Sequence, residues 1–291
     1  MTLLKKIVSR TRDAGAARAL EIAAYAGAAA WLGASFVGVP SWMSGVAEIG
    51  ANRTFVVMIA VLVAALGLTV LSELGELYGQ RARDLYANSV FAALQRGEKP
   101  APYSLYLRPF ASTNVIGANV GIGMQAERIE LEAQIERATR PIGPLIALGA
   151  PLEHIGAGRI QVGDDAWRAA IALLLKHATL IVMLPSSRAG TLQEIGIILG
   201  SALVTRTVLI DPPNLGTSKT YNHAIEWAKI QAAFKEASFH LPDEQRGGSL
   251  IFYGDSREPL LREHLQIDAE DRIERIFTRI LKFQKTRRVT S

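Results

Sequence analysis

The sequence predicts an α/β protein: an N-terminal transmembrane helical hairpin, then an open, mainly parallel sheet with helices on both faces. Two observations predict it. Two long apolar stretches lie near the N-terminus, and beyond residue 100 short, wholly apolar runs alternate with helical patterns. A strand that helices cover on both faces has no polar side, so its sequence is apolar throughout. We expect residues 1–100 to form the hairpin and a connecting helix, and residues 101–291 to form the α/β domain.

The two apolar stretches are Ile22–Val39 and Thr54–Leu71, and each runs 18 residues without a charge. About 20 apolar residues cross a bilayer as a helix, so both stretches are near the required length. Either stretch alone is also compatible with a buried core helix. Two in tandem, joined by a short loop, favour a membrane hairpin with spans at about 20–39 and 54–72.

The basic residues predict the orientation of this hairpin. They stand before the first span and after the second, whereas the loop 40–53 holds only Arg53. The positive-inside rule then places both termini and the α/β domain in the cytoplasm of a multi-pass inner (cytoplasmic) membrane protein. A cleaved signal peptide, with a weak site at 45–47, is the alternative. The flanking basic residues are Lys5, Lys6, Arg10, Arg12, Arg18, Arg81, Arg83, Arg96 and Lys99.

Composition limits the chemistry and the partners. The chain has no cysteine, which excludes disulfides, thiolate nucleophiles and cysteine metal sites, and its five histidines show no paired metal spacing, so we predict no metal site. The net charge of +5 is concentrated beside the spans and in the tail 279–288. Lipid bilayer is the predicted partner, with anionic lipid or plain solvent around the tail, and no nucleic acid. Small-residue pairs such as Ala29/Gly33 permit homo-oligomerisation through the spans; the α/β domain is a second possible route.

Beyond residue 71 the pattern predicts helices and strands in alternation. The helices are expected at 72–100, 126–140, 165–178 with Asp164 as its cap, from 191 onward, at 218–237 and at 269–285. The strands are expected at 104–110, 144–150, 159–162, 179–185, 207–213 and 249–254.

In open α/β sheets, ligands bind outside the carboxyl ends of the strands. This rule selects residues at the ends of the expected strands or just behind them: Arg108, Phe110, Ser186, Gly190, Thr191, Glu194 and Asp211. Arg108 is the predicted anion partner, with an ion pair to a neighbouring carboxylate as the alternative. Gly117, Gly121 and Gly123 precede an expected helix, where glycines and a helix N-terminus favour a phosphate; a surface loop is the alternative.

Glu194 allows two interpretations. It stands three residues after Thr191, the spacing of a capping box in which the carboxylate accepts the Thr191 backbone N–H. This interpretation explains the Thr–Glu spacing. It does not explain Gly190, or the position directly after a buried strand. The second interpretation is that Glu194 faces a ligand.

Two families resemble this region. The motif Gly190-Thr191-x-x-Glu194-x-Gly196 resembles that of nucleoside deoxyribosyltransferases and related Rossmann-like, nucleotide-processing families. Residues 167–199 are similar to the middle of TIR domains, and residues 105–110 to the first TIR strand. The resemblance covers about 104–211 and implies a Rossmann-like (TIR/flavodoxin-like) sheet. The chain departs from the two patterns at Gln193 and Ala189.

The resemblance implies that Glu194 acts on an N-glycosidic bond, as a nucleophile or by holding the ribose while positive charge develops. NAD or another nucleotide is then a substrate or ligand, and no resident cofactor is expected. Arg108 and the Gly117–Gly123 loop would hold phosphate, and Ser186 and Asp211 would contact ribose. A non-catalytic TIR-like sensor or interaction module coupled to the hairpin is the alternative, and a structural membrane protein with an empty α/β domain is a third.

Overall fold

The structure is a computed structural model that divides into two units, Met1–Tyr86 with Pro151–Ile155, and Ala87–Ala150 with Gly156–Ser291. It describes residues 2–47, 53–108, 117–120, 127–152, 156–163, 165–211, 223–245, 247–265, 275–280 and 282.

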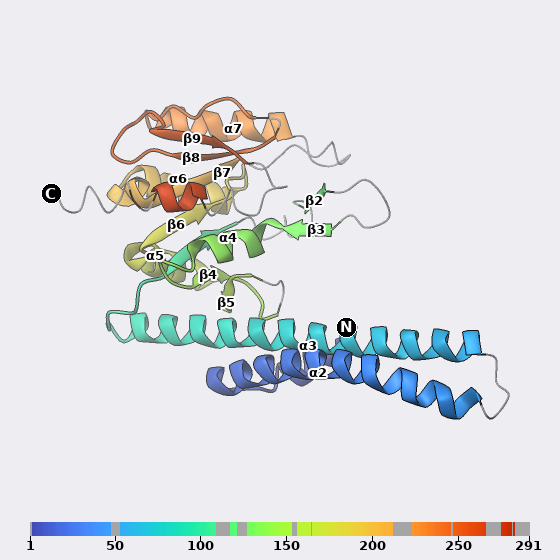
Figure 1. Cartoon of the computed structure of the whole chain (residues 1–291). Coiled ribbons are helices and arrows are strands. Elements are labelled where there is room, and N and C mark those ends of the chain that lie inside the picture. The colour runs from blue at the N-terminus through green and yellow to red at the C-terminus, as the bar shows by residue number, and fades with distance from the viewer. Residues whose placement is uncertain are drawn as a thin grey trace. The chain divides into compact units, whose positions relative to one another are not determined.

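The first unit is helical (Figure 1). Its elements are α1 (Thr2–Val8), α2 (Ala14–Ala47) and most of α3 (Arg53–Gln95), whose last residues, from Ala87 on, belong to the second unit. The helix expected at 72–100 is the continuation of the second apolar stretch, because α3 runs without a break to Gln95. It ends just before Gly97, whose φ of +78° is a left-handed conformation that glycine adopts without steric cost.

Helices α2 and α3 pack closely and antiparallel through glycines of α3. A Cβ atom at Gly67 would overlap the ring of Trp31, and one at Gly75 would lie 2.9 Å from Tyr25 Cζ. The Trp31 ring is held in place by a hydrogen bond from its Nε1 to the carbonyl of Ala64, at 3.0 Å. Small residues on one helix thus admit large side chains of the other, which is how membrane helices commonly approach.

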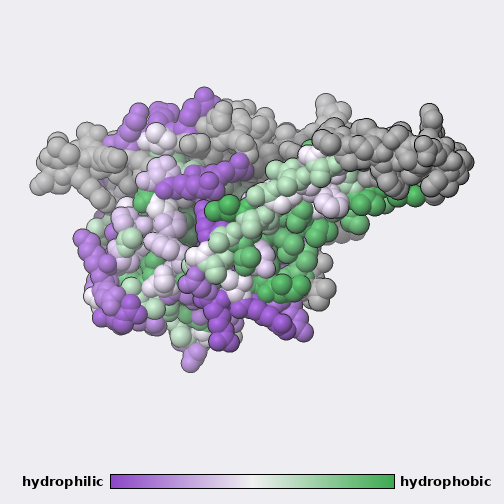
Figure 2. All heavy atoms as spheres, turned by 60° about the horizontal axis from the view of Figure 1, so that its bottom comes forward, coloured by the Kyte–Doolittle hydropathy of each residue, from purple (hydrophilic) through white to green (hydrophobic). Residues whose placement is uncertain are grey.

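One helix, Val61–Gln95, is long and apolar enough to cross a membrane by length and composition. Only 11% of its most apolar window is buried, which disfavours the alternative of a core helix. In Figure 2, hydrophobic residues gather along the two long helices. The other expected span falls within α2, which is helical as predicted, but its described residues do not meet the same criterion. The two-span topology therefore stays a prediction.

The second unit contains a seven-stranded Rossmann-like sheet in the order β5-β4-β1-β6-β7-β8-β9. The first five strands in this order are parallel, as predicted, whereas β8 and β9 are antiparallel, which the sequence analysis missed. The strands are β1 (Ser104–Leu107), β4 (Leu145–Leu148), β5 (Gly158–Ile160), β6 (Leu180–Met183), β7 (Thr207–Asp211), β8 (Ser249–Phe252) and β9 (Leu261–His264).

Helices cover both faces of this sheet (Figure 1). Residues of α4 (Leu131–Thr139) and of a helical segment at 275–280 share one buried cluster with Tyr106, Val182 and Val208. The alternate strand residues, such as Met183 and Leu209, face the other side, where α6 (Ala189–Leu199) and α7 (His223–Glu236) lie. The remaining helices are α5 (Trp167–His177), with Tyr103 Oη donating to its Leu174 carbonyl, and the short 3₁₀ helix η1 (Ala202–Arg206).

The starts of α4 and α5 differ from the sequence prediction. The helix expected at 126–140 begins at Leu131, because Glu127–Glu130 forms a strand, β3, that pairs antiparallel with β2 (Gly117–Val120). Helix α5 has Ala166 as its N-cap, without a side-chain cap, and the predicted cap Asp164 lies outside the described residues. Neither strand of the β2–β3 pair contains an apolar run from which a strand could have been predicted.

Part of the connection from β4 to β5, Pro151–Ile155, belongs to the helical unit. Its Leu152 packs with Val8 and Leu77, and its backbone N–H donates to Asp84 Oδ2 at 2.9 Å. The Leu152 carbonyl accepts from Lys5 Nζ at 2.8 Å. Leu152 has φ +57°, which is unfavourable for a non-glycine residue, so these two backbone contacts hold a strained conformation.

The strand order defines a topological switch point between β1 and β6. The chain proceeds from β1 to β4 on one side and continues to β6 and β7 on the other. Crevices for ligands form at such points, outside the carboxyl ends of the two strands. Arg108 follows β1 and Ser186 follows β6, so both flank this position.

Close helix packing in the first unit gives a stability test. Gly67→Ala should weaken the α2–α3 pairing by about 1–3 kcal/mol, because the new methyl group displaces the Trp31 ring and its hydrogen bond. Gly33→Ala is the matched control, since a Cβ there meets no atom within 4 Å and alanine favours the helix. Denaturant unfolding of the full-length protein in detergent measures both. Equal stabilities of the two variants would contradict the packing.

Candidate functional site

Glu194 does not belong to a capping box. Helix α6 begins at Ala189, and its N-cap is Arg188 in an extended conformation (φ −70°, ψ 142°) without a side-chain cap. Thr191 is therefore the third residue of the helix, and the capping-box prediction is wrong. The earlier start follows from a turn in which Ser186 Oγ accepts the Arg188 backbone N–H at 3.1 Å.

Glu194 is instead a buried carboxyl on the inward side of α6. It is 7% exposed and shares this side with Thr191, Ile195 and Ile198. Within the described ranges Glu194 forms neither a hydrogen bond nor an ion pair. Burial raises the pKa of Glu194 from 4.5 to about 7, because removal from water disfavours the charged form. A carboxyl of this kind can release and accept a proton near neutral pH.

Helix geometry tilts the Cα–Cβ bond of Glu194 toward the carboxyl edge of the sheet. Helical side chains tilt toward the N-terminus of their helix, and α6 begins at that edge, directly after β6. Gly190 lies one turn before Glu194 and faces Trp167 of the preceding helix α5, since a Cβ at Gly190 would lie 3.5 Å from Trp167 Cη2. That is an ordinary contact distance, so packing against Trp167 alone does not require glycine at position 190.

Arg108 lies on the opposite side of the sheet from Glu194. Its Nε is 3.8 Å from Glu132 Oε2, and both side chains are about nine-tenths buried. Glu132, in the first turn of α4, also accepts from Arg159 and from the Ala157 backbone N–H at 3.0 Å. The alternative of an ion pair for Arg108 is therefore confirmed.

The separation follows from strand alternation. Arg108 is two residues beyond Tyr106, which faces the α4 side, and side chains two apart on a strand share a face. Glu194 reaches the sheet from α6, on the other face. The structure therefore brings Arg108 and Glu194 to the same switch point but does not join them.

Ser186 and Asp211, the predicted ribose contacts, both accept hydrogen bonds from backbone N–H groups in this structure. Ser186 stabilises the turn before α6, as described above. Asp211 is fully buried, and its Oδ2 accepts from the Gln245 backbone N–H at 2.8 Å and from Ser249 Oγ at 3.3 Å. Because Asp211 and Ser249 are also partners in the β7–β8 pairing, this carboxylate fixes the end of β7 to β8. A role of either residue in ribose binding stays a prediction.

Part of the predicted phosphate loop can be located. Gly117 begins β2, which pairs with the strand directly before α4. Gly121, Gly123 and Phe110 lie outside the described residues.

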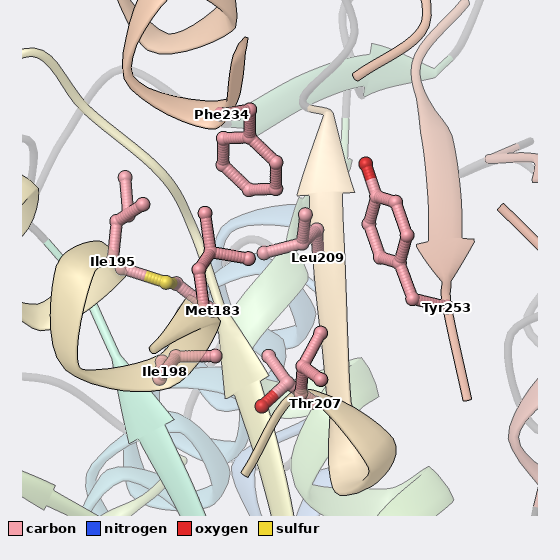
Figure 3. A pocket seen from close by; sticks show the side chains of 9 residues that line it. Met183, Ile195, Ile198, Thr207, Leu209, Phe234 and Tyr253 are labelled. Atoms are coloured by element: carbon pink, nitrogen blue, oxygen red, sulfur yellow. The ribbon is translucent and has the colours of Figure 1, made fainter. Parts of the chain in front are cut away.

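A small apolar cavity lies beside α6 (Figure 3). It encloses about 230 Å³ of empty space including its opening to solvent, less than the roughly 300–1,000 Å³ of ordinary ligand pockets. Glu194 does not line it. We therefore assign the cavity to packing between α6, α7 and the sheet. Its lining residues are Met183, Ile195, Ile198, Leu199, Val204, Thr207, Leu209, Phe234 and Tyr253.

The sequence analysis missed a contact at the carboxyl end of β6. Ser187 donates a short hydrogen bond to Glu226 in the first turn of α7, and Lys229 Nζ contacts the other carboxylate oxygen at 3.0 Å. The Ser187 hydrogen bond, followed by that of Lys229, lowers the pKa of Glu226. The only signal was the position of Ser187 after a buried strand. Among the described residues no cluster of three potential metal ligands occurs.

Comparison with known proteins identifies no family for this chain. No protein-family model, no curated protein and no solved structure matches the chain.

Burial of Glu194 predicts a pH-dependent effect of Glu194→Gln on stability. Below pH 4.5 the carboxyl is protonated in both the folded and the unfolded state, so the substitution should change the free energy of unfolding little. Above pH 4.5 the unfolded state loses the proton first, so the wild type becomes less stable as pH rises, until Glu194 also ionises in the folded state near pH 7. Glu194→Gln should then be the more stable protein, by up to about 3 kcal/mol at pH 8.

Denaturant unfolding of the full-length protein at pH 5, 6, 7 and 8 measures this difference. Glu258→Gln, at an exposed position, is the control and should show no such trend. A constant difference between Glu194→Gln and wild type across the series would mean that Glu194 is not held in an apolar environment.

Proposed function

We propose that this protein is a membrane-anchored nucleotide-binding protein whose Glu194 cleaves or transfers at the N-glycosidic bond of NAD or a related nucleotide. One observation carries the proposal. Glu194 is 7% exposed, is not a helix cap, and has no hydrogen bond or ion pair within the described part of the chain. Burial of a carboxyl that no described residue pairs with disfavours its charged form, so the position of Glu194 at the carboxyl side of a Rossmann-like sheet supports a chemical role.

The pKa of about 7 allows two roles for Glu194. For a purine nucleotide, protonated Glu194 would donate its proton to the leaving base as the C–N bond breaks. Water would then add to the oxocarbenium carbon, and ionised Glu194 would take the proton that this water loses. For NAD, nicotinamide leaves as a neutral molecule without needing a proton, so Glu194 would act only as the ionised base or as an electrostatic partner of the cation.

A second candidate function is a sensor that transmits ligand binding to the hairpin without catalysis. The β4–β5 connection supports it. This connection starts at the carboxyl edge, where β4 ends at Leu148, and its Leu152 is held by Asp84 and Lys5 of the helical unit. A movement at the end of β4 would therefore be transmitted along the chain to Leu152, whose backbone is bound to α1 and α3.

Turnover separates the two candidates. Full-length protein in detergent is incubated with NAD or AMP, and release of nicotinamide or adenine is followed. We expect Glu194→Gln to lower the rate at least about 100-fold, the usual contribution of a general acid or base, and Glu258→Gln to leave it unchanged. Equal rates for wild type and Glu194→Gln would remove Glu194 from catalysis. Binding without turnover would favour the sensor.

The pH dependence identifies the role of Glu194. With NAD, kcat should rise as pH increases through about 7, because the ionised form is needed. With AMP, kcat should fall over the same range, because proton donation needs the neutral form. A flat profile with both ligands would contradict an acid or base role.

Membrane anchoring is tested on the exposed apolar face of α3. Leu66 is 63% exposed in the helix that is apolar enough to span, and Leu66→Arg should reduce the membrane-embedded fraction because a central arginine costs about 2.5–3.5 kcal/mol on insertion. Leu260→Arg is the control, since Leu260 is 45% exposed in the α/β unit. Alkaline extraction of membranes measures the fraction retained. Complete extraction of the wild type would refute the anchor.

A further inference from the structure

Helix α1 lies against α3 just beyond the apolar stretch of that helix. Val8 of α1 is fully buried and packs with Leu77 of α3. The apolar stretch ends at Leu71, so Leu77 lies about 9 Å further along the helix axis. The segment that precedes α2 and the part of α3 that follows its apolar stretch are therefore side by side. The same cluster contains Leu4, Leu74, Tyr78 and Leu152.

Hydrogen bonds fix the position of α1 and of the turn that follows it. Arg81 of α3 donates from Nε to the Thr11 carbonyl at 2.8 Å, and Lys5 Nζ donates to the Leu152 carbonyl at 2.8 Å. Asp13 then caps α2, because its Oδ1 accepts the Ala16 backbone N–H at 2.7 Å. Two of the basic side chains and the one acid of residues 2–13 are thus used to hold the segment in place.

Three further cations of this segment have no such structural use. Lys6, Arg10 and Arg12 are exposed, and within the described ranges their side chains form no hydrogen bond and no ion pair. Glu73 and Glu76, the exposed acids that follow the apolar stretch of α3, do not pair with them there either. Residues 2–13 carry four cations against one acid, so the segment presents a positive surface.

An exposed apolar side chain accompanies these cations. Ile7 follows Lys6 directly and is 46% exposed, although its neighbour Val8 is fully buried. Short helices that expose basic and apolar side chains together are typical of the membrane interface, where the apolar side chain enters the edge of the acyl region and the cations meet the headgroups. The exposed residues of α1 therefore match a bilayer surface better than plain solvent.

We propose that Lys6, Ile7, Arg10 and Arg12, here called the α1 surface, bind the headgroups of anionic phospholipids. This inference rests on the membrane anchor of the proposed function, because α1 reaches a bilayer only if the adjoining apolar stretch of α3 is inserted in one. It adds the class of lipid that the protein selects. Charge complementarity identifies this class, since phosphatidylglycerol is negative and phosphatidylcholine is neutral overall.

Titration of the full-length protein in a neutral detergent with short-chain phosphatidylglycerol, at fixed ionic strength, tests the lipid class. Replacing Lys6, Arg10 and Arg12 together by glutamine should weaken binding about 100-fold, because each basic residue beside an anionic lipid surface contributes about five-fold. The matched control removes the same charge from exposed positions of the α/β unit and should bind as wild type does. It combines Arg168→Gln, Lys176→Gln and Lys235→Gln.

Equal affinity in wild type and the α1 triple variant would overturn the proposal. Binding of short-chain phosphatidylcholine or of inorganic phosphate as tightly as phosphatidylglycerol would overturn it too, because the surface would then not select anionic lipid. A second triple variant, Lys6→Arg with Arg10→Lys and Arg12→Lys, retains the charge and should bind about as tightly as wild type. A folding defect at these positions would not be reversed in this way.

Site-specific labels test the position of α1 separately from the anchor. The chain has no cysteine, so Ile7→Cys, Leu66→Cys and Leu260→Cys each carry a fluorophore at one place. In bilayers of phosphatidylglycerol and phosphatidylcholine with brominated acyl chains, we expect quenching at positions 7 and 66 and none at position 260. Quenching at 66 without 7 would leave the anchor and overturn the α1 surface. Quenching at 7 without 66 would leave the α1 surface and remove the anchor, and quenching at neither would overturn both.

Discussion

Burial of the Glu194 carboxyl on the inward side of α6 is the constraint on which the functional account depends. The helix packs Ile195 and Ile198 against the sheet, and the same packing removes Glu194 from water. Within the described residues nothing compensates the charge, so the pKa of Glu194 rises to about 7. A group that changes charge near neutral pH is suited to proton transfer or to a charge-dependent ligand.

The sheet determines what can act together with Glu194. Strand alternation directs Arg108 toward α4, where it pairs with Glu132, and α6 lies on the other face. On that face, Gly190 in the first turn of α6 lies against the ring of Trp167, the first residue of α5. The candidate site therefore lies on the α6 face of the sheet and not in a crevice that both faces share.

The sequence analysis predicted the elements that a short run of neighbouring residues is enough to identify. The apolar runs at β1, β4, β6, β7 and β8 each form a strand near the expected residues, because a fully buried strand leaves no polar position. The antiparallel direction of β8, and β9 itself, were missed, since a run such as Leu250–Phe252 has the same composition in either direction. The β2–β3 pair lacks such a run altogether.

The candidate site was predicted only in part for the same reason. The position of Glu194 behind a buried strand placed it in the helix that begins at the carboxyl end of β6, as the structure has it. The Thr191–Glu194 spacing predicted a cap, yet the turn at Ser186 starts the helix two residues earlier. The Arg108–Glu132 pair and the Trp167–Gly190 contact join residues far apart in the chain, and no local pattern announces them.

Infrared difference spectroscopy of wild type against Glu194→Gln tests the central claim most directly, because the carboxyl C=O band reports protonation of this one group. The band assigned to Glu194 should disappear with a midpoint near pH 7. A midpoint near the ordinary glutamate value of about 4.3 would show a hydrated or paired carboxylate, and would contradict the account.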